Sequence, residues 1–140
     1  MATRVAYEHA ASEFAATGRS LRILAADVDT MDPAAIVRGG RLGRLVPHHL
    51  EQSSVMARIA AAQVDAAAAE CRRRAAVIAA YEAELRVYNG HVAAYLRSFD
   101  SWRRRYDAWA AGPGDLRPPV PPTAPVAPAP PPPWADVLGG

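Results

Sequence analysis

The sequence contains no lysine, a single cysteine and no long apolar run, and each absence excludes a class of protein. All 16 Lys/Arg positions are arginine, and 14 Asp and Glu residues reduce the formal net charge to +2. So small a net charge does not indicate a broad nucleic-acid or membrane footprint. Cys71 has no second cysteine with which to form an internal disulfide. No stretch approaches the ~20 apolar residues that a membrane span requires.

The first residues also lack the form of a secretory signal peptide. Charged side chains interrupt MATRVAYEHAASEF where such a peptide needs an apolar core. We therefore expect a cytoplasmic protein, or one secreted by a route that does not use that signal.

Residues arranged for catalysis or metal binding are not found. His48 and His49 are adjacent, and no pair of histidines or cysteines has the i,i+4 or Cys-x-x-Cys spacing of a zinc site. The glycine cluster at 39–43 has no lysine and no preceding strand, so it does not predict a phosphate loop. Cys71 is interpreted as a buried, inert thiol. We expect no enzyme activity, no cofactor, no metal and no small-molecule substrate.

Proline is concentrated at one end of the chain. Of the 13 prolines, 11 lie between Pro113 and Pro133, which predicts that residues 112–140 form a disordered tail of polyproline II type. Its PxxP spacings, such as Pro118 with Pro121, favour a spacer over a specific ligand. Trp134 is the one part of the tail that resembles a docking anchor.

The remaining residues, 1–111, have the pattern of an all-α, antiparallel helical hairpin. A first helix is expected at about 3–31, a connector at 32–47 and a second helix at about 48–111. Gly18 lies beside the apolar stripe of the first helix. The stripe consists of Tyr7, Ala10, Phe14, Thr17, Leu21, Leu24, Val28 and Met31.

The second helix has a heptad repeat with apolar residues at positions a and d. Arg74, at a d position, is the one departure over seven repeats. The a positions are Ala57, Val64, Cys71, Ile78, Leu85, Val92, Phe99 and Tyr106. The d positions are Ala60, Ala67, Arg74, Tyr81, Tyr88, Tyr95, Trp102 and Trp109.

The heptad face is narrow and alanine-rich in its first half and wide in its second. The first helix would be ~38 Å long, whereas the heptad face runs for ~80 Å, so the first helix would cover it only as far as about Ile78. Burying the ten large side chains beyond that point is worth on the order of 20 kcal/mol before ordering costs. These ten residues, called the aromatic seam below, are Ile78, Tyr81, Leu85, Tyr88, Val92, Tyr95, Phe99, Trp102, Tyr106 and Trp109.

Two interpretations of Arg74 remain open. A charge within a heptad face can fix the register or the choice of partner. Alternatively, the long side chain reaches the edge of the face and keeps its guanidinium in water.

An exposed aromatic seam indicates a protein that pairs with another helical chain or with a second copy of itself. Two alanine-rich helices, a glycine-containing connector and a proline-rich end resemble the small helical-hairpin proteins (WXG and PE-like) of actinobacterial type VII (ESX) secretion. The resemblance covers roughly residues 3–110 and is one of architecture and composition. It implies a substrate or accessory partner of that machinery that works as a helical dimer. The alternatives are a structural coiled-coil homodimer and a small nucleic-acid-associated regulator.

Overall fold

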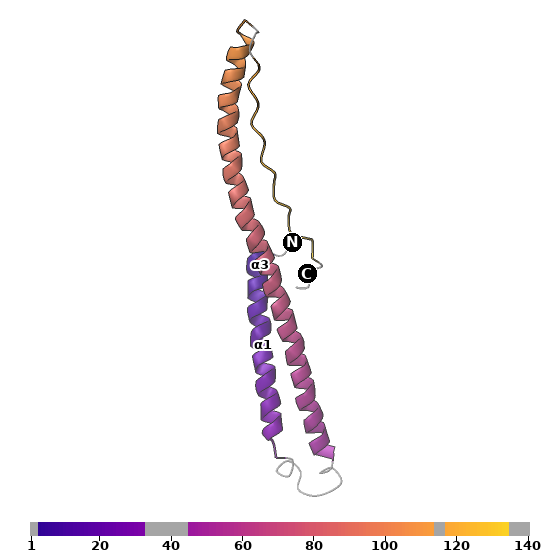
Figure 1. Cartoon of the computed structure of the whole chain (residues 1–140). Coiled ribbons are helices and arrows are strands. Elements are labelled where there is room, and N and C mark those ends of the chain that lie inside the picture. Colours follow the sequence, from indigo (N-terminus) through magenta and orange to yellow (C-terminus); the bar gives the residue numbers. More distant parts are fainter. Residues whose placement is uncertain (1–2, 33–44, 114–116, 135–140) are drawn as a thin grey trace. The chain divides into compact units, whose positions relative to one another are not determined.

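The computed structural model describes residues 3–32, 45–113 and 117–134, and they form two α-helices followed by an extended segment (Figure 1). Helix α1 is Arg4–Thr30 and helix α3 is Leu45–Ala110. The prediction of an all-helical chain with two helices is confirmed, since the described residues contain no strand. None of the helices in these ranges is both apolar and long enough to span a bilayer.

The chain divides into two compact units. The first unit is Met1–Ala76 with Trp134–Gly140, and the second unit is Val77–Pro133. Helix α3 therefore contributes its first part to one unit and its second part to the other.

Local sequence explains where the helices begin and end. Thr3 caps α1, because its side-chain oxygen accepts a hydrogen bond from the backbone N–H of Ala6 at 3.3 Å. Met31 leaves the helix in an extended conformation, shortly before Pro33, which disfavours helical geometry in the residue that precedes it. Helix α3 starts at Leu45, three residues before the expected start, and Pro47 lies in its first turn. Most of the predicted connector lies outside the described residues.

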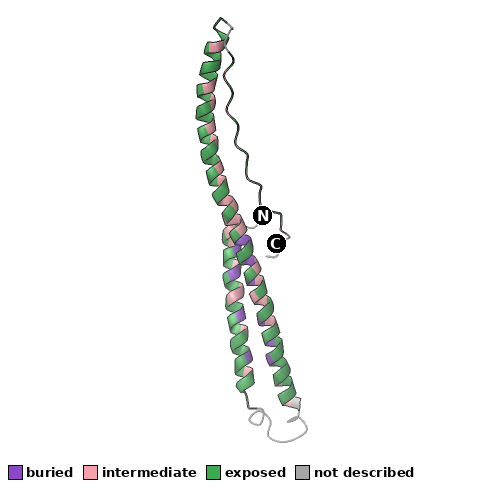
Figure 2. Ribbon diagram, in the orientation of Figure 1, coloured by how far each residue is buried: buried purple, intermediate pink, exposed green. Residues whose placement is uncertain are grey.

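Figure 2 colours the buried residues of the first unit purple, and most of these residues have small side chains. The fully buried residues of α1 are Tyr7, Ala11, Gly18 and Ala25. Those of α3 are Ser54, Ala57, Ala61, Ala68, Cys71, Arg74 and Ala75. Because alanine and glycine project little beyond the backbone, two helices that meet through them can approach closely.

The face of α1 that packs on α3 differs from the stripe expected from the sequence. Leu24 and Met31 are 52% and 47% exposed, whereas Gly18 is buried. A Cβ atom added to Gly18 would lie 2.5 Å from an oxygen of Asp65, so the two helices are in close contact at this glycine. The small residues face α3 because they permit this contact, and the larger ones are displaced to the edge.

Helix α3 shows a corresponding difference from the expected a and d face. Its fully buried residues in the first unit are mainly at the a and e positions, as for Ala57 and Ala61. Ala60 and Ala67, at d, are only half-buried. Alanine at e brings α1 toward that side of α3, so the contact is centred between a and e.

Two ion pairs connect the helices at the edges of this core. Arg22 pairs with Asp65, and Arg58 pairs with Asp29. As the residue number rises along α1, that of the partner on α3 falls. The pKa of Asp29 is lowered by the neighbouring Ser54 side chain and, secondarily, by Arg58. Exposed pairs of this kind contribute ~0–1 kcal/mol each, so they orient the helices more than they stabilise them.

Candidate partner-binding site

The aromatic seam lies along one face of α3 in the second unit. Nine of its ten residues are half-buried, and the tenth, Tyr106, is 38% exposed. The described residues of the second unit include none that is fully buried (Figure 2). The seam is therefore a surface of large side chains that its own unit covers only in part.

Five aromatic rings of the seam form a continuous row. Consecutive ring centroids are 5.9 Å apart for Tyr95–Phe99, 5.2 Å for Phe99–Trp102, 5.3 Å for Trp102–Tyr106 and 5.4 Å for Tyr106–Trp109. The row follows from the alternating spacing of three and four residues, which places each side chain beside the next on a helix. Neighbouring rings restrict one another's rotamers, so the row is a preorganised aromatic surface.

Part of the proline-rich tail covers the seam within the second unit. Residues 117–133 have no regular secondary structure and run beside the orange part of α3 (Figure 1). The indole N–H of Trp102 donates a hydrogen bond of 2.8 Å to the carbonyl oxygen of Pro119. Further along the helix, Val126 and Pro128 line a shallow groove together with Tyr88 and His91. The tail thus contacts the seam at Trp102 and borders a groove beside Tyr88.

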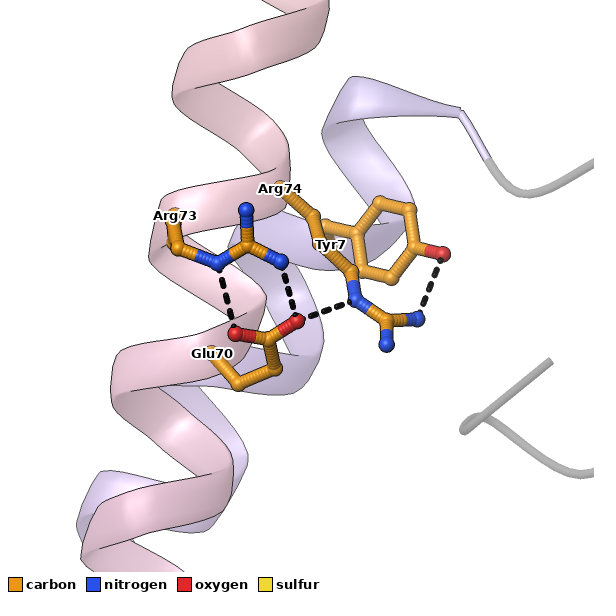
Figure 3. A network of polar contacts seen from close by, with 4 residues as sticks. All are labelled: Tyr7, Glu70, Arg73 and Arg74. Atoms are coloured by element: carbon orange, nitrogen blue, oxygen red, sulfur yellow. Dashed lines mark hydrogen bonds and ion pairs between the residues drawn. The ribbon is translucent and has the colours of Figure 1, made fainter. Parts of the chain in front are cut away.

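A polar and aromatic cluster surrounds Arg74 in the first unit (Figure 3). The Nε–H of Arg74 donates to Glu70 at 2.8 Å, and its Nη1–H donates to the hydroxyl of Tyr7 at 3.4 Å. Its guanidinium carbon lies 5.7 Å from the ring centre of Tyr7 and 5.5 Å from that of Trp134. The two rings meet edge to face at 6.0 Å. Arg74 therefore contacts α3, α1 and the end of the tail at once.

Glu70 binds two arginines in this cluster. Arg73 donates to both carboxylate oxygens, at 2.7 Å and 2.6 Å, while Arg74 donates to one of them. These hydrogen bonds, those from Arg73 foremost, lower the pKa of Glu70 from 4.5 to about 2. The carboxylate is therefore ionised at neutral pH and balances the charge of the arginine that is buried beside it.

The structure bears on the second interpretation of Arg74, in which the guanidinium reaches water at the edge of the face. The side chain is 10% exposed, so its guanidinium does not reach solvent at the edge of the helix. Its role in fixing register or partner choice stays a prediction. Sequence reasoning missed Tyr7 and Trp134 as its neighbours, because contacts between distant segments have no local pattern.

Side chains suited to metal binding do not converge in the part of the chain that the structure describes. Within residues 3–32, 45–113 and 117–134, no cluster of three His, Cys, Asp or Glu side chains is placed to hold a metal ion. Cys71 is buried in the alanine-rich core of the first unit. The aromatic seam therefore remains the feature that best suggests a function. Comparison with protein-family models, with curated proteins and with solved structures gives no match to this chain.

Proposed function

We propose that this chain is a helical interaction protein: an antiparallel hairpin whose long second helix pairs through the aromatic seam with a helix of another protein or of a second copy. One observation carries the proposal. The last fully buried residue of α3 is Ala75, and all ten residues of the seam follow it. The large side chains of the seam thus begin where the closely packed core ends.

The chemistry of the seam suits a helical partner. Rings spaced along one helix face fit the anchor positions of a second amphipathic helix, which recur at i, i+3, i+4 and i+7. Tyrosine and tryptophan supply large contact areas at low entropic cost and are enriched at the centres of interfaces. A contiguous aromatic row of this length exceeds the scattered exposed apolar residues of an ordinary surface.

The biological setting we propose is type VII (ESX-like) secretion, in which the chain would be a substrate or an accessory partner. The support is the resemblance in architecture: two alanine-rich helices that pack together, followed by a proline-rich end. In this setting the partner would be another small helical protein, and the chain would act in the cytoplasm or be exported with it.

The first test is the association state of the purified full chain with a matched pair of variants. Phe99→Glu places a charge in the seam, whereas Ser101→Glu places the same charge on an exposed position of the same helix turn. Sedimentation equilibrium over a wide concentration range should show self-association that Phe99→Glu weakens at least tenfold and Ser101→Glu leaves within about twofold.

A second arm covers a heterologous partner. If the wild-type chain is monomeric, co-expression with the proteins encoded beside it should give a complex that Phe99→Glu abolishes and Ser101→Glu retains. A chain that stays monomeric at high concentration and binds none of these neighbours would contradict the proposal. Equal effects of the two variants would place the interaction away from the seam.

A further inference from the structure

We infer that the proline-rich segment 117–133 is an internal ligand of the aromatic seam, held as a polyproline II helix that a helical partner must displace. The docking of this segment stands on the contacts described below. The competition with a partner rests in addition on the proposed function.

The pattern of burial along the tail indicates a polyproline II helix lying on one face. Every third residue is half-buried, and the residues between are exposed, with Val120 at 84% and Val126 at 91%. A polyproline II helix has three residues per turn, so every third side chain points the same way. The half-buried residues are Pro119, Pro122, Pro125, Pro128 and Pro131, and the series continues to Trp134.

All five half-buried positions of the segment are proline, whereas the exposed positions also include valine, threonine and alanine. The contacting face is thus uniform in composition and the exposed face is mixed. A spacer without a docking function has no reason to place proline at a strict interval of three residues. The interval of three therefore indicates that the proline rings are the groups with which the segment contacts α3.

Lengths along the tail and the helix agree within the second unit. From Pro119 to Pro128 a polyproline II helix extends about 28 Å at 3.1 Å per residue. The groove that Pro128 lines is bounded on α3 by Ala83 and His91. These residues lie between about 17 and 29 Å along the helix from Trp102, at 1.5 Å per residue. An extended segment that starts at Trp102 therefore reaches the groove without a bend or a loop.

The two surfaces are also chemically complementary. A polyproline II helix forms no internal hydrogen bonds, so its carbonyl groups are free to accept from a donor. The indole N–H of Trp102 is such a donor, and it binds the carbonyl oxygen of Pro119 at 2.8 Å. Aromatic rows bind proline-rich segments in several recognition domains because the ligand is already extended and loses little entropy on binding.

The residue that follows the segment, Trp134, belongs to the first unit and makes contacts there. In the first unit, the Trp134 ring packs edge to face on Tyr7 and faces the guanidinium of Arg74. A tethered ligand has an effective concentration in the millimolar range, so weak individual contacts suffice to keep it bound. A partner helix that needs the same face of α3 must therefore bind more tightly than the tail does.

The test uses the full chain and a pair of double variants displaced by one residue. Pro122→Asp with Pro131→Asp changes two half-buried prolines, and Pro121→Asp with Pro130→Asp changes two exposed ones. The readout is the solvent exchange of the Trp102 indole N–H, observed by 15N-labelled NMR. A Trp102→Phe variant identifies its signal.

In the contact-face variant the indole exchange should accelerate about tenfold or more, and in the exposed-face variant it should stay within about twofold of wild type. A free peptide of residues 117–133, added at millimolar concentration to the contact-face variant, should restore slow exchange. The same peptide with both aspartates should not. Equal exchange in the two variants, or no restoration by the wild-type peptide, would overturn the docking of the tail.

Association measurements then separate the two proposals. If the tail competes with a partner, the contact-face variant should associate at a concentration about tenfold lower than the exposed-face variant. Association that is lost in Phe99→Glu but equal in the two tail variants would overturn competition and leave the proposed function intact. A changed indole exchange with no effect of Phe99→Glu on association would instead contradict the proposed function and leave the docked tail.

Discussion

The two helical glycines whose surroundings are described provide a test of how closely α1 and α3 approach. Gly18 of α1 is buried, and a Cβ atom there would meet Asp65 at 2.5 Å and the carbonyl oxygen of Ala61 at 3.7 Å. Gly90 of α3 is exposed, and a Cβ atom there would meet nothing within 4 Å. Changing each glycine to leucine makes the same chemical change in two opposite environments.

The expected effects have opposite signs. In a helix, leucine is favoured over glycine by about 0.8 kcal/mol, and Gly90→Leu should gain that amount. At Gly18 the same gain is opposed by overpacking, which costs typically ~1–3 kcal/mol. The new side chain must also move the Asp65 carboxylate away from Arg22. This ion pair is half-exposed, so its loss costs only about a few tenths of a kcal/mol. We expect Gly18→Leu to lose about 1–2 kcal/mol.

Urea denaturation followed by far-UV circular dichroism measures both changes, and hydrogen exchange of peptides around each site assigns them to the correct helix. Gly18→Ala provides an intermediate step: its single carbon lies too close only to the movable carboxylate of Asp65 and in ordinary contact with the Ala61 carbonyl, so its effect should be near zero. If Gly18→Leu stabilises the chain as much as Gly90→Leu does, the close contact of the two helices at Gly18 is wrong.

Three further predictions concern the cluster around Arg74. Tyr7 is 3% exposed, so Tyr7→Ala should cost about 3 kcal/mol in urea denaturation, whereas Tyr7→Phe, which loses one hydrogen bond of 3.4 Å, should cost less than about 1 kcal/mol. Arg74→Lys should increase acrylamide quenching of Trp134 in a chain whose other two tryptophans are phenylalanine, because an ammonium group does not stack on rings as a planar guanidinium does; unchanged quenching would argue against the stack. The lowered pKa of Glu70 means that its carboxylate stabilises the fold above pH 4.5 and that this contribution is lost as the pH falls toward about 2. The difference in urea midpoint between wild type and Glu70→Gln should therefore be larger at pH 7 than at pH 3, and a difference independent of pH would contradict it.

The existence and type of the helices could be predicted from the sequence because they depend on local pattern. Apolar spacing of three and four residues, a threonine before Arg4 and a proline after Asp32 are all visible in a single sequence. These signals act over a few residues, so they require no knowledge of tertiary contacts.

The contacting face of each helix could not be predicted in the same way. Ranking side chains by hydrophobicity favours Leu24 and Met31 over Gly18, yet these two are about half exposed and the glycine is buried. The preference is reversed because close backbone approach buries more surface along the whole interface than two larger side chains would. Only the sequence of α3, which has alanine at the e positions Ala61, Ala68 and Ala75, reveals this choice.

The contact between the seam and the tail shows a different limit of prediction from sequence. The heptads predict the seam, and the proline content predicts the tail, but neither pattern connects the two. The interval of three from Pro119 to Pro131 was available in the sequence, and it matches the half-buried positions of the structure. It carries information only when it is compared with the turn of a polyproline II helix, whereas proline content alone suggests a spacer.

The two ways in which this chain covers α3 differ in how readily they can be reversed. Small residues that interdigitate, as around Gly18, leave no room for a substitute, and separating them exposes the whole alanine face. A polyproline segment has little entropy to lose, and Trp102 donates a hydrogen bond to it. Removing such a segment costs less free energy than separating the two helices. On the proposed function, the aromatic seam of α3 then becomes available to a partner. A permanent cover on the alanine-rich part and a displaceable cover on the aromatic part are what an interaction protein needs if its binding face must stay shielded until the partner arrives.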